Sequence, residues 1–131
     1  MKIKQTTFYA LKAIRRIYLE NEEILTSNII AEKEKLSQGV LLRLLRILDR
    51  AGILCVHQGR GIVSGGFSLA KSIDEITLLD VVKVVEDVDI CKNLDEAVGR
   101  QDALLFDHCR EINNHIQEEF SRYTIRDLFG L

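Results

Sequence analysis

The sequence has few cysteines and no long hydrophobic run, and each shortage excludes a class of protein. Three cysteines in 131 residues cannot form the disulfide framework of a small secreted domain, so a reducing cytoplasm is the expected compartment. No apolar stretch approaches the ~18 residues of a membrane span, and the start, from Met1 to Gln5, lacks the pattern of a signal peptide. We therefore expect a cytoplasmic protein with no membrane partner.

Net charge is also small, but its distribution is uneven. The formal charge is -2 at pH 7 and 47% of the residues are hydrophobic, which favours a folded chain of one domain, with or without an appendage. Residues 1–70 carry eleven lysines and arginines against six acids, whereas residues 71–131 carry seven against fourteen. A basic first part predicts a polyanionic partner, and the acidic remainder predicts a different role.

Apolar residues recur at helical spacing in the first fifty residues. The repeat from Phe8 to Tyr18 predicts a first helix, capped by Thr6 or Thr7. Thr26 is placed to cap a short second helix. Ser37 is placed to cap a third, which Gly52 ends in a left-handed conformation. The buried stripe of this third helix comprises Val40, Leu41, Leu44, Leu45 and Leu48.

Strand-forming residues follow the third helix. The runs 53–57 and 67–70 flank a glycine-rich loop and predict a two-stranded hairpin. Thr77 and Asp80 have the spacing of a capping box ahead of a helix over 81–86.

A long helix is predicted from about residue 100 to 123. Its narrow apolar seam favours packing against a second copy of the same helix, with folding back onto its own domain as the alternative. The seam comprises Leu105, Cys109, Ile112, Ile116, Phe120 and Tyr123.

This order of elements predicts a mostly α fold with a small β-hairpin. Three short helices, a hairpin and positive charge indicate a winged helix-turn-helix over 1–72, with an effector loop and dimerisation helices over 73–131. The third helix is then the reader of the DNA major groove, in which Arg43 suits guanine and Gln38 suits adenine. The predicted DNA-contacting residues are Thr7, Thr26, Ser37, Gln38, Gly39, Arg43, Arg46, Arg50, His57, Gln58, Arg60 and Ser64.

Leu42 does not suit this polar face. An outward leucine there must either contact a thymine methyl group or be partly buried. The acidic second part and Leu42 also permit a second hypothesis, in which the same fold binds another protein instead of DNA.

The glycine-rich loop does not match a nucleotide-binding motif. Ser64 stands where the third glycine of a dinucleotide fingerprint belongs, and Phe67-Ser68 follow Gly66 where a P-loop needs lysine. As a wing tip, the loop places Arg60 to enter an A·T-rich minor groove. No catalytic motif is present, so an enzyme is not expected.

Five segments in order resemble the bacterial Rrf-two family of transcription regulators, over essentially the whole chain. The resemblance implies a homodimer joined through the long helix, a palindromic operator and usually repression. Compared with the family, Phe8 replaces a basic residue, Lys35 a glycine and Leu42 a polar residue, and the wing is longer by residues 61–64. The segments are Phe8-Tyr9-Ala10-Leu11, Ile30-Ala31-Glu32, Leu48-x-x-Ala51-Gly52-Ile53-Leu54, Gly65-Gly66-Phe67-Ser68-Leu69-Ala70 and Glu75-Ile76-Thr77-Leu78-Leu79-Asp80-Val81-Val82.

The same resemblance raises the question of a cofactor. Cluster-binding members carry three cysteines around the start of the long helix, and here only Cys91 matches, with Ala97 and Ala103 near the other positions. Since an iron–sulfur cluster needs about four ligands, we expect no cofactor. A cluster or a redox-sensitive thiol at Cys91 stays as an alternative.

The remaining candidate ligands have ordinary explanations. Cys55 is expected in the core of the first strand and Cys109 in the dimer seam. His108, Glu111 and His115 share one side of the long helix, as a divalent metal site or as a solvated helix face.

Overall fold

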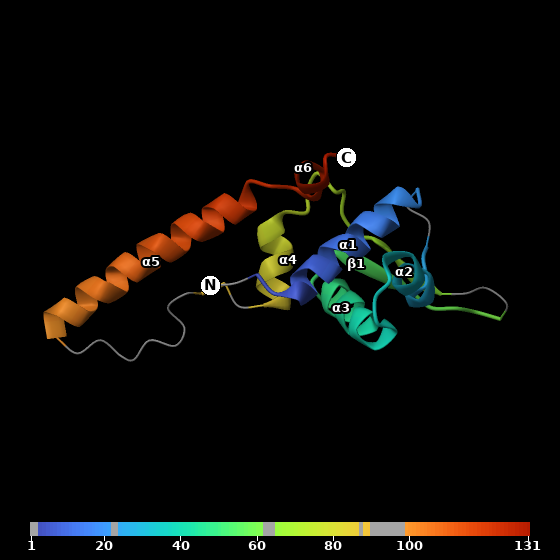
Figure 1. Cartoon of the computed structure of the whole chain (residues 1–131), viewed down its shortest axis with the longest axis horizontal. Helices are drawn as coiled ribbons and strands as arrows, with labels where there is room; N and C mark the ends of the chain where they lie inside the picture. The colour runs from blue at the N-terminus through green and yellow to red at the C-terminus, as the bar shows by residue number, and fades with distance from the viewer. Residues whose placement is uncertain (1–2, 22–23, 62–64, 87, 90–98) are drawn as a thin grey trace.

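A computed structural model of the chain describes residues 3–21, 24–61, 65–86, 88–89 and 99–131. The predicted fold class is confirmed, because helices dominate and the two strands form one antiparallel hairpin. Figure 1 shows the first four helices gathered with the hairpin in one body, from which α5 extends. The elements are α1 Gln5–Leu19, α2 Ser27–Glu34, α3 Gln38–Arg50, β1 Leu54–His57, β2 Gly66–Leu69, α4 Leu78–Val85, α5 Gly99–Ser121 and α6 Ile125–Phe129.

The core forms where α1 and α3 face each other. Ile14 and Ile17 of α1 are fully buried, and the stripe predicted for α3 is also buried at Leu41, Leu44, Leu45 and Leu48. Val40, in the first turn of α3, is only half-buried. Each buried leucine contributes about 1.5–3 kcal/mol relative to an exposed one, so the stripe determines which face of α3 turns outward.

The core continues past residue 72, the boundary predicted between the two functional regions. Ile73, Ile76 and Val81 belong to the same cluster as the residues of α1 and α3, and so does Ile125 of α6. The α6 helix, which the sequence pattern did not predict, returns the chain to α1 (Figure 1). The helices α4 and α6 therefore complete the body that carries α3.

Side-chain caps explain several helix starts. Thr26 accepts a hydrogen bond from the backbone N–H of Ile29, and Thr77 and Asp80 form the predicted capping box. Ser37 is the N-cap of α3, although its side chain makes no capping hydrogen bond. The prediction of a threonine cap on α1 was wrong: the N-cap is Lys4.

The chain leaves two of these helices in a left-handed conformation. Gly52 follows α3 with φ 78, as predicted. Lys35 ends α2 with φ 55 and ψ 48 in the turn before α3. This conformation is one that glycine adopts readily and lysine does not, so Lys35 holds a strained backbone in this turn.

The hairpin packs closely against the segment before α2. Leu25 exchanges two backbone hydrogen bonds with Phe67, of 3.0 and 2.7 Å. A Cβ atom on Gly66 would lie 2.4 Å from the carbonyl oxygen of Leu25, and one on Gly65 would lie 2.2 Å from that of His57. Only glycine allows the backbone to approach this closely, which explains why Gly65 and Gly66 occupy these two positions.

Cys55 is exposed, contrary to prediction. Its expected burial assumed that it alternates with Ile53 on one face. However, β1 begins at Leu54, and Leu54 itself enters the core. Both Ile53 and Leu54 are buried in succession, so Cys55 faces solvent.

Within the described ranges, no helix combines the length and apolar character that a membrane crossing requires.

Candidate nucleic-acid interface

The outward face of α3 is cationic. Arg43, Arg46 and Arg50 are all exposed, at spacings of three and four residues that place them along one side of the helix. The buried leucines hold the opposite side in the core. This orientation is the one predicted from the apolar stripe.

We call the β1–β2 hairpin and its loop the wing. A concavity of about 550 Å³ lies between α3 and the wing. Arg46 and Arg50 line it from α3, and His57 and Gln58 line it from the wing. Thr26 closes it at the start of α2. Residues of α2, α3 and the wing thus line one concavity, to which Arg46 and Arg50 bring positive charge.

One hydrogen bond joins the wing to α3, and another orients His57 within the wing. The carboxylate of Asp49, near the end of α3, accepts a hydrogen bond of 3.3 Å from the backbone N–H of Val56. The ring of His57 lies 2.7 Å from the hydroxyl of Ser68 on the paired strand. The first contact ties the reading helix to β1, and the second holds His57 at the rim of the concavity.

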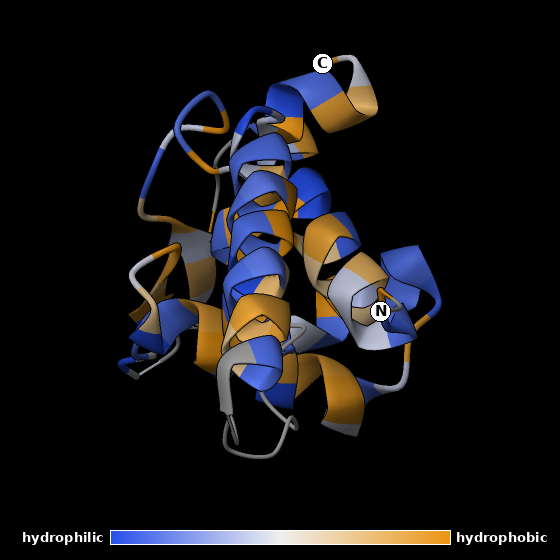
Figure 2. Ribbon diagram, turned by 90° about the vertical axis from the view of Figure 1, so that its left-hand side faces the viewer, coloured by the Kyte–Doolittle hydropathy of each residue, from blue (hydrophilic) through white to orange (hydrophobic). Residues whose placement is uncertain are grey.

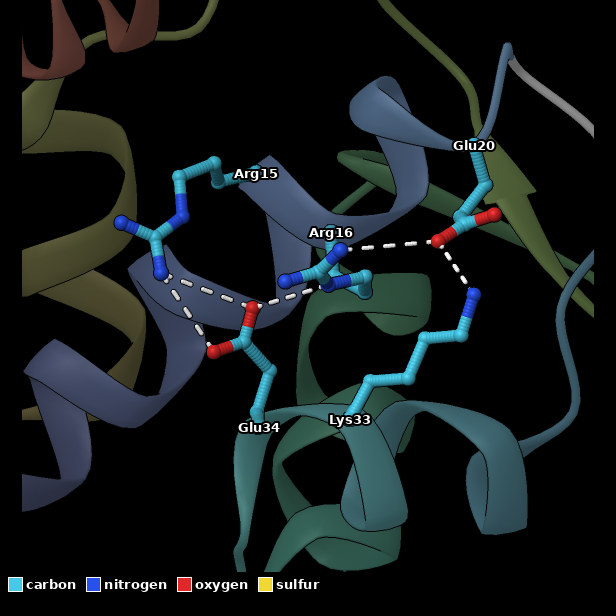
Figure 3. A network of polar contacts seen from close by, with 5 residues as sticks. All are labelled: Arg15, Arg16, Glu20, Lys33 and Glu34. Carbon is cyan, nitrogen blue, oxygen red and sulfur yellow. Dashed lines mark hydrogen bonds and ion pairs between the residues drawn. The ribbon is translucent and has the colours of Figure 1, made fainter.

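Three other cations of the basic region, Arg15, Arg16 and Lys33, are paired with acids, as Figure 3 shows. Glu34 receives Arg15 at 3.3 Å and Arg16 at 3.1 Å. Lys33 lies 2.6 Å from Glu20, and its hydrogen bond lowers the pKa of that carboxyl. These pairs join α1 to α2 and neutralise their charge.

By contrast, no ion pair among the described residues involves Arg43, Arg46, Arg50 or Arg60. The unpaired arginines of the N-terminal part, among the described residues, therefore lie on α3 and the wing. Unpaired arginines on an exposed helix attract phosphate strongly, because each neutralised phosphate releases counterions.

Some of the predicted DNA-contacting residues are exposed in the structure, and one is buried. Ser37, Gln38 and Gly39 are exposed in the first turn of α3, and Arg60 is exposed on the wing. Thr7 was wrongly predicted to face DNA: it is fully buried. Its hydroxyl donates to the carboxylate of Glu86.

Two residues of the concavity escaped prediction, and two predicted residues cannot be placed. Ser27, directly after the Thr26 cap, lines the concavity, and so does Val56, whose side chain is 41% exposed. A helix start beside a cap could have suggested Ser27, but nothing in the sequence marks Val56. Ser64 and Cys91 lie outside the described residues.

The metal alternatives do not form a site. Within the described residues, no group of three or more histidine, cysteine or acidic side chains could hold a metal ion. His108, Glu111 and His115 are exposed along α5 without converging. Cys55 is on the wing and Cys109 is half-buried on α5, so these two do not share a site either.

The fold and this surface define a winged helix-turn-helix protein that binds DNA. Residues 3–130 match the Rrf2 family, described as "Iron-dependent Transcriptional regulator". The chain belongs to that family and is a DNA-binding transcriptional regulator rather than an enzyme.

Individual relatives agree with this assignment. Protein aau3 of Rhizobium meliloti (strain 1021) is 34% identical over 134 residues, covering 98% of this chain and 84% of the relative. A protein of Aquifex aeolicus (strain VF5), named as an HTH-type transcriptional regulator, is 26% identical over 137 residues, with coverage of 100% and 93%.

Solved structures share the fold over nearly the whole chain. CymR (YrzC), the global cysteine regulator of B. subtilis, superposes with a TM-score of 0.73 at 25% identity, covering 98% of this chain and 95% of that one. IscR of T. potens superposes with a TM-score of 0.71 at 21% identity, with coverage of 99% and 87%.

Proposed function

We propose that this regulator acts as a homodimeric repressor on a palindromic operator in the cytoplasm. The observation that carries the DNA contact is the exposed row of Arg43, Arg46 and Arg50, which has no acidic partner among the described residues. Gln38 and Arg43, near the N-terminus of α3, contact base edges. Arg46 and Arg50 bind phosphates, and Arg60 enters the adjacent minor groove.

The homodimer is supported by the surface of α5. Leu104, Leu105 and Ile112 are each at least half exposed, at 50%, 54% and 53%. In Figure 2, hydrophobic and hydrophilic segments alternate along this helix. An exposed apolar stripe of this kind marks a protein contact, and a second α5 presents the matching stripe.

Two half-sites should then lie about one helical turn apart, ~34 Å, on one face of the duplex. The test is a mobility-shift titration against the promoter of the protein's own gene, repeated at several salt concentrations. Specific binding whose affinity falls with salt supports the proposal. Failure to bind duplex DNA of any sequence would favour a protein-interaction module on the same fold.

Repression has its own test, because activators bind operators too. A reporter gene under the bound promoter should be expressed more strongly when the regulator gene is deleted. Reduced expression in the deletion strain would show activation instead.

Light scattering of the purified protein tests the homodimer, because it measures the mass against the 15.0 kDa of one chain.

We also propose that the chain works without a resident iron–sulfur cluster, although the family description names iron dependence. The whole sequence holds three cysteines, and the two that the structure describes lie on different elements. A cluster requires about four ligands. Anaerobically purified protein should be colourless and free of iron, and a visible absorption band with bound iron would contradict this.

A further inference from the structure

The outward face of α3 carries a second, smaller depression, which we call the α3 notch. It has a volume of about 260 Å³, and its lining includes Gly39, Leu42, Arg43, Arg46 and Arg50. Leu42 is half-buried: one side packs against the hydrophobic core, and the other borders both the notch and the concavity beside the wing. The notch is therefore an apolar spot within the cationic face.

Gly39 makes room above this spot. A Cβ atom on Gly39 would meet no atom within 4 Å, so the site is open rather than crowded. Gly39 precedes Leu42 by three residues and lies on the same side of the helix. Glycine within a helix costs about 1 kcal/mol relative to alanine, and no packing requirement in this structure explains it. Gly39 therefore leaves the surface beside Leu42 open.

The chemistry of the notch combines two demands on its occupant. An apolar floor favours a methyl or similar group, whereas three arginines without acidic partners among the described residues favour a polyanion. A hydrocarbon alone would gain nothing from the arginines, and a phosphate alone would gain nothing from Leu42. Thymine in the DNA major groove satisfies both, because its C5 methyl group projects into a groove bordered by phosphates.

We propose that Leu42 is a specificity-determining residue that contacts the C5 methyl group of one thymine in each operator half-site. This proposal rests on the proposed function and adds a base preference to it. Leu42 selects thymine by excluding water from the methyl group, while Arg46 and Arg50 hold the flanking backbone. Gly39 permits the approach.

The experiment begins with selection of bound duplexes from a random pool, using the full chain. Each thymine of the selected site is then replaced in turn by deoxyuridine, which lacks only the methyl group. At one position per half-site, we expect the replacement to weaken binding about three- to tenfold. At the other positions we expect less than a twofold change.

Two variants connect this methyl effect to the notch. Leu42→Ala should bind thymine and uracil duplexes equally, and thermal unfolding establishes that it is folded. Gly39→Ala, whose new methyl group meets open space in the free protein, should remain folded but weaken binding to the thymine duplex. Leu42→Met retains apolar bulk and should keep most of the discrimination.

The possible outcomes separate the inference from the function beneath it. If duplexes are selected but no thymine shows a uracil penalty, or if Leu42→Ala keeps the penalty, the inference is wrong and the regulator still binds DNA. If no duplex is selected at all, the proposed function and the inference both fail.

Discussion

Arg43 and Arg50 occupy the same exposed side of α3, two turns apart. Their distances from the N-terminus of the helix give them different expected roles. The N-terminal turns of a reading helix meet base edges, whereas the later turns lie nearer the backbone. Replacing Arg43 and replacing Arg50 should therefore impair DNA binding in two distinguishable ways.

Replacing Arg43 by alanine should relax the base preference at one position per half-site, by about 1–3 kcal/mol of discrimination. Replacing Arg50 by alanine should weaken binding equally for all sequences and reduce the slope of affinity against salt by about one. Titrations with matched and mismatched duplexes measure both. Lys83→Ala on α4, outside both depressions, is the control and should change neither. Identical behaviour of the two arginine variants would contradict these roles.

Acid sensitivity is also a property of single residues. Hydrogen bonds from Lys33 to Glu20 and from Arg126 to Asp74 lower the pKa of each carboxyl from ordinary values of 4.5 and 3.8. Since the folded values lie below the unfolded ones, both groups stabilise the fold fully above those ordinary values, and the stabilisation disappears as pH falls through the folded values. Both sites are exposed, so added salt should weaken the effect.

Thermal unfolding between about pH 6 and pH 3 measures this contribution. The midpoint temperature should fall with acidification, and Glu20→Gln with Asp74→Asn should make the fall shallower. An unchanged pH profile in the double variant would show that these pairs do not contribute.

At the scale of elements, the sequence predicted those helices and strands that follow a local spacing rule. It did not predict features that depend on tertiary packing. The α3 stripe, the Thr77–Asp80 capping box and the hairpin follow local rules of spacing, and all three are confirmed except at Val40 of the stripe, which is only half-buried. The α6 helix is only five residues long, too short for a periodic signal. Its capping box, Thr124 with Asp127, has the same spacing as that of α4 and could have indicated its start, whereas its position against α1 depends on tertiary packing.

The candidate site shows the same division. The exposure of Arg43, Arg46 and Arg50 follows from the buried leucines opposite them. The burial of Thr7 does not, because it depends on Glu86, a partner 79 positions away. This long-range contact explains why Thr7 was misplaced.

Gly65→Ala should damage the wing. The added Cβ would lie 2.2 Å from the carbonyl oxygen of His57 and 2.7 Å from the backbone nitrogen of Gly59, so the backbone must move apart. We expect a loss of stability on the order of 1–3 kcal/mol and weaker DNA binding. Gly39→Ala makes the same chemical change in open space and should not lower the unfolding temperature. Equal stability of the two variants would contradict the packing at Gly65.

Lys35→Gly should stabilise the helix-helix turn. The backbone at Lys35 is left-handed, which costs a side-chain-bearing residue roughly 1–2 kcal/mol relative to glycine, partly offset by glycine's larger unfolded-state entropy. A net gain of about 0.5–1 kcal/mol in unfolding free energy is expected, measured by denaturant titration. Glu32→Gly, three residues earlier within α2, is the matched control and should destabilise by about 1 kcal/mol. A loss at Lys35 would show that the turn differs in solution.

At the scale of the whole molecule, the exposed stripe on α5 predicts the assembly. Ile112→Glu should convert a dimer into a monomer, because the side chain is 53% exposed in one chain and would place a charge within the interface. Light scattering should show the mass falling from twice 15.0 kDa to 15.0 kDa. Asn114→Glu, at an exposed position nearby, is the control. A variant that keeps its wild-type mass would locate the interface elsewhere.

Arg15 of α1 contacts both the C-terminal helix α6 and the end of α2. Its guanidinium group lies 4.7 Å from the centre of the Phe129 ring in α6 and also binds Glu34, whose side chain is only 6% exposed, directly before the turn into α3. The Phe129 ring thus packs against the guanidinium group of an ion pair that joins α1 to the end of α2, directly before the turn into α3. A change confined to the C-terminal helix, such as Phe129→Ala, should expose the Arg15–Glu34 ion pair to water and weaken operator binding. Every side chain that faces the duplex is retained in this variant.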